Sequence, residues 1–475
     1  MSSFNTLRDL YKQHGLHNFP AIVTQHFRNA LASEQIPELD LHNPPASFPD
    51  GSLVLFRAMI QDTSLPSTLY LATTADGHCG GWGIPEVTSP DQDVDYSNLR
   101  EASTFWAVSI PGLSAWCSSN ESQSPPLDLH QPIQPHKFPL PGVNHIGVQV
   151  KIYDQNLSKD LRATDLVSFV GMLDSEPLQS GFDLPESIHV PTLHVLFSTP
   201  IPITIVPRLF PEPSLLPKVN ALREEVITWI AEEGLAGDRI AAEWVLLCTI
   251  ARVRSRQPPI LPLSLTISGF PSNPENSQAT PALYRVLSHL FPIVTLYPLV
   301  LDALNNTPFQ PKSKDEDLHS GLLQQPKGAI LLLTEGAVKE GGILSEGVMS
   351  IRSVQQMLKH QTLEYTFPFS GFEFETDVNV VVTTEGRQSI VFETDINIPF
   401  RPAISEGVTN ELYKTVAVPS EEKLLLFRQL VGGSKIGDVT VTKAFGKYIE
   451  DDFVRERALN SEKTNGTTGL ASFSI

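Results

Sequence analysis

The strongest constraint on the fold of this 475-residue chain is a proline-rich segment at residues 201–217, IPITIVPRLFPEPSLLP. Closely spaced prolines lack the backbone N–H, so this segment interrupts both helices and central strands. Before it, short apolar runs are bounded by Pro, Gly, Asp or Asn, which is typical of β-strands. After it, helical spacing alternates with continuous apolar runs, which indicates strand–loop–helix units. We therefore predict an α+β chain of several domains, with a boundary after residue 205.

The region before this boundary is predicted to contain a small helical element and a β-barrel. Apolar residues recur at spacings of three and four in the first stretch, so residues 1–40 are predicted to be helical. Residues 41–205 then contain six strand-like runs: SLVLFRAMIQD, STLYLATT, TFWAVSI, VQVKIY, DLVSFVGML and LHVLFS. Short strands at this density favour a small barrel or sandwich, and we expect an OB-like barrel. The polar, proline-containing tracts near residues 84–100 and 118–136 are predicted to be disordered insertions.

The region after the boundary, residues 206–460, is predicted to form an α/β domain. Asp238 is expected to cap the helix DRIAAEWVLLCTIARV. The strand LSLTISG at residues 263–269 is followed by a loop and then by the helix ALYRVLSHL. Thr280 and Pro281 are expected at the N-cap and first-turn positions of that helix.

The same alternation continues downstream. The pattern predicts a buried strand GAILLLTEG, a helix SVQQMLKH, a hairpin turning near Gly371 and a second buried strand VNVVVTTEG. Helices are expected at about residues 420–431 and 440–458. The polar tail, residues 461–475, is expected to be disordered.

Charge, cysteine content and hydropathy limit the function classes. The net charge is −19, from 34 basic and 53 acidic residues, so a nonspecific nucleic-acid binder with a broad basic face is disfavoured, and nucleic-acid involvement is expected to be indirect. Cys79, Cys117 and Cys248 are odd in number and far apart, which predicts a reducing compartment and no disulfide framework. The most apolar helical run, residues 240–250, is too short to span a bilayer, and charges near the start of the chain argue against a secretory leader.

The strand–loop–helix unit that starts at residue 263 is where a nucleotide-binding protein would hold a phosphate. A phosphate loop, GxxxxGK[ST], supplies glycines, a lysine and a hydroxyl group. After Gly269 the chain instead reads FPSNPENSQATPALYR, which has no further glycine, no lysine and three prolines. A standard phosphate loop is therefore absent from this position of the sequence.

The ends of the next two buried strands are equally unsuited to ATP hydrolysis. Glu335 follows Thr334 where magnesium would need an acidic pair, and Thr384 and Glu385 stand where a polar sensor would face the γ-phosphate. A glutamate in that place would repel phosphate. We therefore predict no ATP hydrolysis, and we interpret Glu335 as a solvated strand-end residue.

No catalytic, cofactor-binding or metal-binding residue is assigned from the sequence. CxxC and HxxxH spacings are absent, and so are a GxSxG elbow and an HExxH helix. The remaining candidates receive structural interpretations: His78, Cys79, Cys117 and His136 as ordinary surface or core residues, Asn156 as an unused sequon, Glu450, Asp451 and Asp452 as a solvated helix face, and Trp229 and Trp244 as core.

Five blocks, in this order, carry a resemblance to a known family: SLVLFRAMIQD, HKFPLPGVNHIGVQVKIYD, LAGDRIAAEWVLLCTIARVRSRQPPILPLSLTISGFP, LHSGLLQQPKGAILLLTEG and YIEDDFVRER. Together they resemble the minichromosome maintenance (MCM) complex-binding protein family over nearly the whole chain. The chain differs from longer relatives in a shorter insertion after Cys117 and in lacking a recognisable basic nuclear-import cluster.

The resemblance implies a nuclear, non-catalytic protein without cofactors that binds subunits of the replicative helicase. It implies roles in handling newly made subunits, in removing the helicase from chromatin late in S phase and in sister-chromatid cohesion. The order of elements after residue 206 looks like the ATPase core of the helicase subunits, where a hairpin precedes the sensor strand. This implies a degenerate AAA+-like, MCM-like domain that mimics a subunit surface.

Two other function classes remain open at this point. One is a weak nucleotide-dependent enzyme with a non-standard phosphate loop, in which Lys327 or Arg387 supplies the missing positive charge. The other is a scaffold whose barrel binds single-stranded nucleic acid through the aromatic residues of FRAMIQD and TFWAV.

Overall fold

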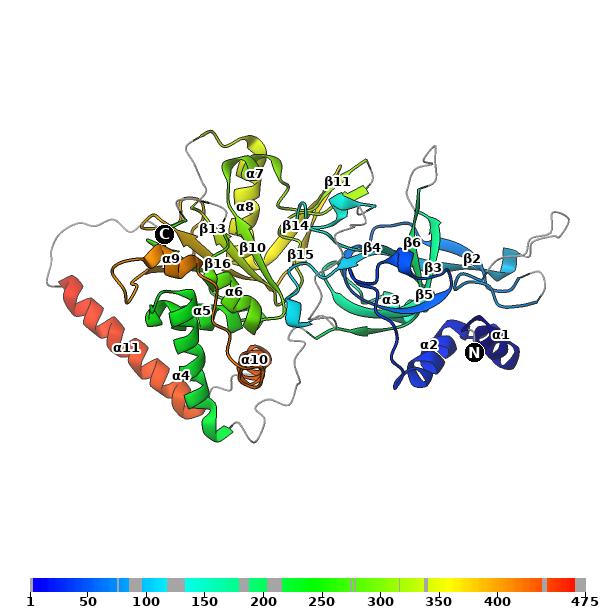
Figure 1. The fold of residues 1–475 in the computed structure, drawn as a ribbon, viewed down its shortest axis with the longest axis horizontal. Helices are drawn as coiled ribbons and strands as arrows, with labels where there is room; N and C mark the ends of the chain where they lie inside the picture. The colour runs from blue at the N-terminus through cyan, green and yellow to red at the C-terminus, as the bar shows by residue number, and fades with distance from the viewer. Residues whose placement is uncertain are drawn as a thin grey trace. The chain divides into compact units, whose positions relative to one another are not determined.

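Figure 1 shows the computed structural model of the protein. The structure describes residues 3–74, 77–84, 96–117, 133–178, 188–202, 216–273, 276, 279–315, 317–336, 341–437 and 442–465. They belong to two compact units, Met1–Lys435 and Ile436–Ile475. The boundary predicted after residue 205 lies outside the described residues and stays a prediction. The same holds for most of the two tracts predicted to be disordered, although residues 96–98 and 135–137 form short 3₁₀ helices.

Two helices, α1 (Ser3–His14) and α2 (Phe19–Ala30), form the predicted N-terminal element. The chain turns between them through two residues in the left-handed region, Gly15 with φ 68° and Asn18 with φ 52°. Their apolar faces pack on the outside of the β-sheet region, where the shared cluster includes Leu7, Phe19 and Trp82. Burial of this face explains why a short helical pair is stable here, since isolated helices of this length are marginal in water.

Six strands follow, at the six positions where the sequence predicts them: β1 (Ser52–Asp62), β2 (Thr68–Leu71), β3 (Leu99–Ser109), β4 (Gly147–Ile152), β5 (Leu166–Pro177) and β6 (His189–Pro200). Their order is β1-β5-β6-β4-β3-β2, and an additional pairing of β1 with β3 closes five of them into a ring. Only β4 and β6 pair in parallel; the other ladders of the ring are antiparallel. The inward residues, among them Phe56, Val150 and Phe169, fill the interior and are fully excluded from solvent. The short helix α3 (Gln155–Ser158) lies between β4 and β5 in the chain.

A five-stranded parallel sheet organises the second half of the larger unit: β9 (Leu265–Ser268), β10 (Val294–Pro298), β13 (Ile330–Thr334), β16 (Asn379–Thr384) and β17 (Ile396–Pro399). Its order is β10-β13-β16-β9-β17, and every neighbouring pair is parallel. Alternate residues of these strands enter two different apolar clusters, one with Leu332 and Val381 and the other with Leu331 and Val382. Both faces of the sheet are therefore covered, which explains the continuous apolar runs in the sequence.

Helices supply both covers. The cluster on one face includes residues of α4 (Val219–Trp229), α5 (Arg239–Ile250), α6 (Ala282–Leu290), α9 (Val408–Tyr413) and α10 (Glu421–Ile436). The cluster on the other face includes residues of α7 (Leu301–Asn306) and α8 (Ser345–His360). Asp238 caps α5 as predicted, since its Oδ1 accepts from the N–H of Ala241 at 3.1 Å. The predicted start of α6 was one residue too early: Pro281, not Thr280, is the N-cap, because its extended backbone (φ −63°, ψ 147°) places the first helical residue at Ala282.

The predicted hairpin belongs to a separate four-stranded sheet with the order β12-β11-β14-β15. Its strands are β11 (Lys312–Lys314), β12 (Asp317–His319), β14 (Thr362–Phe367) and β15 (Ser370–Glu375). The hairpin turns at residues 368–369, slightly before the predicted position, and Gly371 pairs with Thr366 inside the ladder. A short 3₁₀ helix (Leu216–Lys218), a two-stranded ribbon of β7 (Ser255–Arg256) and β8 (Pro259–Ile260), and a π-helical turn at Ile230–Gly234 complete the described regular elements of this half.

The smaller unit contains one long helix, α11 (Lys443–Asn465). It begins at Lys443, within the helix predicted at 440–458, and continues through residues 461–465, which the sequence assigns to the tail; residues 466–475 lie outside the described part. Glu450 and Asp451 are exposed, in agreement with a solvated acidic face. None of the described helices is long and apolar enough to cross a membrane.

Candidate functional site at the carboxyl edge of the parallel sheet

The three sequence positions tested for nucleotide chemistry come together at the carboxyl edge of the parallel sheet. Strand β16 lies between β13 and β9, and the last residues pair in register, Thr334 with Thr383 and Thr384 with Ser268. The residues that follow each strand therefore share one edge. In open parallel sheets, ligands bind in the crevice outside this edge, so it is the candidate functional site of the fold.

The loop after β9 uses its backbone donors within the protein. The N–H of Gly269 donates to the carbonyl of Gly386 at 2.8 Å, and that of Phe270 donates to the carbonyl of Thr384 at 2.8 Å. Glu385 Oε1 accepts from the N–H of Ser272 at 3.0 Å and also from its hydroxyl group. A phosphate cradle needs such N–H groups to face the ligand. Here one of them faces a carboxylate of the chain itself.

The prediction for Glu335 was wrong: its side chain is buried, with 2% of its surface exposed. Its carboxylate accepts from the N–H of Ile390 at 2.9 Å and from the hydroxyl of Ser389. Glu335 thus holds the loop that follows β16 against the end of β13. Buried carboxylates are stable only when hydrogen bonds satisfy them, and a loop that folds back on the edge supplies these bonds.

A tyrosine also closes the loop after β9. The hydroxyl of Tyr413 donates to the carbonyl of Pro271 at 3.3 Å. Burial, and to a lesser extent the charge of Glu385, raises the pKa of Tyr413 to about 12. Tyr413 therefore stays protonated at neutral pH and closes the loop after β9 as a neutral donor.

The two basic residues considered for a non-standard phosphate site do not assemble such a site. Lys327 precedes β13, which begins at Ile330, so it lies toward the amino edge, opposite Glu335; its ammonium pairs with Asp165 at 3.7 Å. Arg387 follows β16 at the carboxyl edge and is exposed. The enzymatic alternative loses one of its two candidate cations, because phosphoryl transfer needs positive charge at the carboxyl edge.

The barrel aromatics that could have bound single-stranded nucleic acid are internal. Phe56 is fully buried, and Phe105 and Trp106 are 8% and 1% exposed. A stacking platform needs open ring faces, so these residues cannot provide one.

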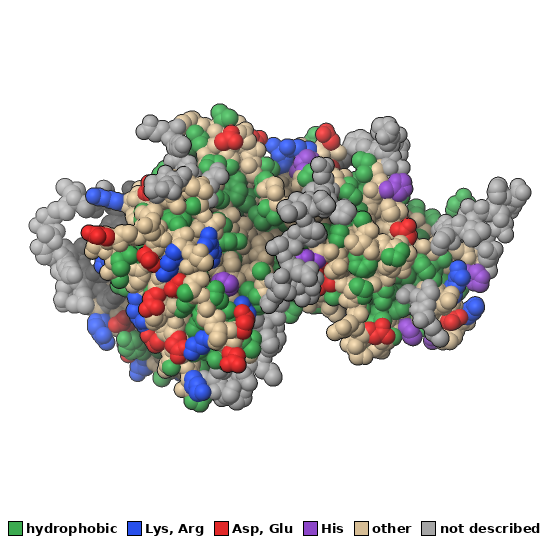
Figure 2. All heavy atoms as spheres, viewed as in Figure 1, with side chains coloured by type: hydrophobic (Ala, Val, Ile, Leu, Met, Phe, Trp, Pro, Cys, Tyr) green, Lys and Arg blue, Asp and Glu red, His purple; other side chains and the backbone are tan. Residues whose placement is uncertain are grey.

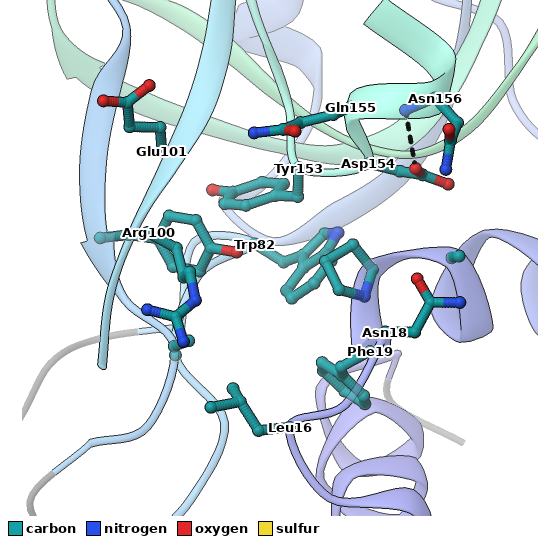
Figure 3. Close-up of a pocket in the computed structure, with 15 residues that line it drawn as sticks. Leu16, Asn18, Phe19, Trp82, Arg100, Glu101, Tyr153, Asp154, Gln155 and Asn156 are labelled. Atoms are coloured by element: carbon teal, nitrogen blue, oxygen red, sulfur yellow. Dashed lines mark hydrogen bonds between the residues drawn. The ribbon is translucent and has the colours of Figure 1, made fainter. Parts of the chain in front are cut away.

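A cavity of about 330 Å³ on the outer side of the barrel offers more aromatic residues but no better platform (Figure 3). Trp82 and Tyr153 stack on each other, with ring centroids 4.4 Å apart, and both are almost fully buried. Arg100 reaches this cavity, but so do Glu101 and Asp154, which would repel phosphates.

The residues given structural interpretations mostly occupy the places expected. Cys79, Cys117 and Cys248 are buried free thiols. Trp229 is buried and donates its Nε1–H to the carbonyl of Ala417 at 3.0 Å, and Trp244 packs partly buried against the same core. His136 is different, because it forms an ion-pair contact with Asp317 on β12 at 2.6 Å. The long sequence separation of these two residues gives no signal from which the contact could be predicted.

Comparison with known proteins extends over most of the chain. Residues 128–470 match the sequence model of a family described as the mini-chromosome maintenance replisome factor. The chain belongs to this family. The match covers strands β4, β5 and β6 of the barrel region, the whole parallel sheet and the described helix α11. The candidate site therefore lies inside the part of the chain that matches the family.

Relatives that share the family likeness come from animals and plants, and each bears the name mini-chromosome maintenance complex-binding protein. The salmon protein (Salmo salar) is 25% identical, over 92% of this chain and 85% of its own length. The human protein is 23% identical over 92% and 86%, and the Arabidopsis thaliana protein is 26% identical over 80% and 77%. The resemblance expected from the five sequence blocks is thereby confirmed.

Proposed function

We propose that the protein is a non-catalytic binding partner of the MCM helicase subunits in DNA replication. Its relatives are named as binding proteins of the MCM complex, and this proposal extends that activity to the present chain. The single observation that carries the non-catalytic part is the carboxyl edge of the sheet, where Glu385 occupies a backbone N–H that a phosphate would need and Glu335 ties down the adjacent loop.

The strand topology supports mimicry of a helicase subunit. Numbered along the chain, the parallel strands have the order 2-3-4-1-5, and a hairpin precedes the fourth strand. This arrangement is similar to the AAA+ core, so we interpret residues 206–460 as a degenerate AAA+-like domain. The ring of five strands, with one parallel pair, is similar to the Greek-key barrel of an OB-fold. A protein with these two parts can occupy a subunit interface without supplying a competent nucleotide site.

The charge of the chain is consistent with this role. A subunit that holds DNA needs basic residues facing it, whereas this chain carries −19. On the face that Figure 2 shows, Lys and Arg side chains alternate with Asp and Glu. Like-charge repulsion would keep such a protein off DNA while leaving it free to bind basic subunit surfaces.

Two measurements test the proposal. The full chain, mixed with purified MCM subunits, should co-elute with at least one of them; failure to associate with any subunit would overturn the binding function. Calorimetry of the chain alone should show no heat of ATP binding in the micromolar range. Micromolar affinity for ATP would contradict the non-catalytic interpretation while leaving subunit binding intact.

The β14–β15 hairpin is the contact element that the chemistry favours. Phe369 at its tip is fully exposed and Phe372 is 55% exposed, so the hairpin presents two aromatic side chains to water. Neighbouring exposed apolar side chains of this kind often mark a protein-binding surface. Residues 362–375 carry three glutamates, Glu364, Glu373 and Glu375, and no basic residue. The fitting occupant is an MCM subunit surface with an apolar pocket rimmed by Lys or Arg, the charge that a DNA-holding subunit must present.

Replacement of both hairpin aromatics tests this contact. The double variant Phe369→Ser/Phe372→Ser should weaken subunit binding at least about tenfold, because exposed aromatics at the centre of an interface typically act as hot spots. The matched control is Leu69→Ser on β2, where the leucine is 58% exposed, and it should bind as the unchanged chain does. Equal affinity of the double variant and the unchanged chain would place the contact elsewhere.

At the cellular level we propose a nuclear protein that handles MCM subunits, promotes helicase removal from chromatin late in S phase and supports sister-chromatid cohesion. Depletion in the source organism should leave MCM subunits on chromatin after replication and increase the distance between sister chromatids. A tagged chain that stays outside the nucleus throughout the cell cycle would contradict this part of the proposal.

A further inference from the structure

A cluster of two histidines and an aspartate lies outside the site described above. His136 belongs to a short 3₁₀ helix just before β4, whereas Asp317 and His319 lie on β12. Residues two apart on a strand point to the same side, so Asp317 and His319 face His136 together. Each residue offers one nitrogen or oxygen atom that could bind a metal ion, and these three atoms all lie within 4.8 Å of one another.

The contacts within this cluster bring nitrogen and oxygen donors together. His136 Nε2 is 2.6 Å from Asp317 Oδ2, and the rings of His136 and His319 are 4.2 Å apart between centroids. The backbone also holds the two segments together, because the N–H of Ser320 donates to the carbonyl of His136 at 2.8 Å. About a third of the side-chain surface of His136 and Asp317 is exposed, so an ion and its water ligands can reach them.

We propose that His136, Asp317 and His319 bind one zinc ion. Two imidazoles and one carboxylate form a donor set that zinc uses in open, three-residue sites, with water as the fourth ligand. The imidazoles also select against magnesium and calcium, which require oxygen ligands. The ion would replace the direct contact between His136 and Asp317 and would tie the entry to β4 of the barrel to β12 of the neighbouring sheet.

The charges around the cluster set the expected affinity. Lys137 contacts the other oxygen of Asp317 at 2.5 Å and the carboxylate of Asp62 at 2.9 Å, so Asp317 can offer zinc only its Oδ2. Lys314, which lies opposite Asp317 in the antiparallel ladder of β11 and β12, adds a second positive charge. These two ammonium groups weaken binding of a dication, which makes the affinity sensitive to the exposed residue Lys314.

Calorimetric titration of the full chain with Zn²⁺ tests the proposal, and Mg²⁺ serves as the comparison ion. We expect one zinc per chain and no binding of Mg²⁺. His319→Gln should weaken zinc binding by at least about tenfold, since the loss of even an outer-sphere group typically costs a metal site 10- to 100-fold. Asp174→Asn is the matched control, because Asp174 belongs to the one other described cluster of metal-ligand type, with Glu176 and His194. It should leave the affinity unchanged.

A second variant keeps the test decisive if His319→Gln does not fold. Lys314→Glu replaces an exposed positive charge with a negative one and should strengthen zinc binding. Tetrahedral d–d absorption of Co²⁺ added in place of zinc should appear in the unchanged chain. Absence of one-to-one zinc binding, an affinity unchanged in both His319→Gln and Lys314→Glu, or loss of binding in Asp174→Asn would overturn the proposal.

Discussion

At the scale of single residues, two ionisable side chains, Glu335 and Lys435, are buried rather than solvated. Glu335 is satisfied by the loop that it holds, through Ser389 and Ile390. Lys435 is 2% exposed and donates to the carbonyls of Thr249 and Gly328 at 3.0 and 2.9 Å and to Asn379 Oδ1 at 2.7 Å. In both cases a buried charged group is retained because backbone and side-chain groups of other segments become its hydrogen-bond partners.

Replacement of Glu335 measures what its carboxylate contributes. Glu335→Ala should lower the free energy of unfolding by about 1–3 kcal/mol, because the N–H of Ile390 and the hydroxyl of Ser389 lose their acceptor in a buried place. Glu335→Gln keeps one acceptor oxygen and should lose less. Urea unfolding of the three chains provides the values; a loss below about 0.5 kcal/mol in Glu335→Ala would mean that the side chain is solvated, as the sequence indicates.

Lys435 makes stability depend on pH in the alkaline range. Burial lowers its pKa from 10.5 to about 8, although Asp377 opposes the shift. Between these values the unfolded chain binds one more proton than the folded chain, so the free energy of unfolding should rise with pH, by up to about 1.4 kcal/mol per unit. The difference between the unchanged chain and Lys435→Met, followed by denaturation from pH 8 to 10.5, isolates this contribution. Parallel curves for the two chains would contradict it.

At the scale of elements, Asp238 shows how one cap organises two segments. Its Oδ1 caps α5 through the N–H of Ala241 at 3.1 Å, and its Oδ2 accepts from the N–H of Arg401 at 2.6 Å. The sequence predicts the first bond, since an aspartate before a helical pattern is a standard signal. The second bond fixes the segment after β17 against the start of α5, and it depends on the fold.

Graded substitution separates these two contributions. Asp238→Asn retains a single side-chain carbonyl oxygen and should lose about 1 kcal/mol of stability, whereas Asp238→Ala loses both bonds and should lose about 2–3 kcal/mol. Thermal and urea unfolding provide the ranking. If Asp238→Asn is as stable as the unchanged chain, the bond to Arg401 contributes nothing measurable.

At the scale of the larger unit, the ion cluster around Lys137 joins the barrel to the four-stranded sheet. Lys137 and Asp62 are 0% and 1% exposed, and Lys137 also contacts Asp317. Burial raises the pKa of Asp317, but the hydrogen bond with His136 and the charge of Lys137 outweigh burial and hold that pKa well below its usual range. A depressed carboxylate pKa contributes stability above the unfolded-state pKa of about 3.9, and this stability is lost as pH falls.

Removal of Lys137 should therefore have a large effect. Lys137→Met leaves Asp62 buried without its cation and should lower the free energy of unfolding by about 3–5 kcal/mol at neutral pH. The matched control is Lys327→Met, which removes an ion pair with Asp165 from a lysine that is 46% exposed, and it should lose less than about 1 kcal/mol. Denaturant unfolding at pH 7 and at pH 4 checks both values. Similar losses of unfolding free energy in the two variants would contradict a strongly stabilising buried ion pair at Lys137.

Whether a feature could be predicted from the sequence depends on how far apart in the chain the interacting residues lie. Strand and helix positions, the cap at Asp238 and the missing phosphate-loop residues follow from local patterns, since hydrophobic period and turn chemistry act over a few residues. The strand order of the parallel sheet does not follow from local patterns, and only the family resemblance implied it. The burial of Glu335 and the partners of Lys137 were not predictable, because they depend on segments that meet only after folding. His136 and Asp317 are separated by 181 positions. By itself the sequence determined the elements, the acidic character and the family resemblance of this protein. Only the tertiary structure decided which carboxylates are buried and which donors converge, because burial and ligand geometry arise from packing between distant segments.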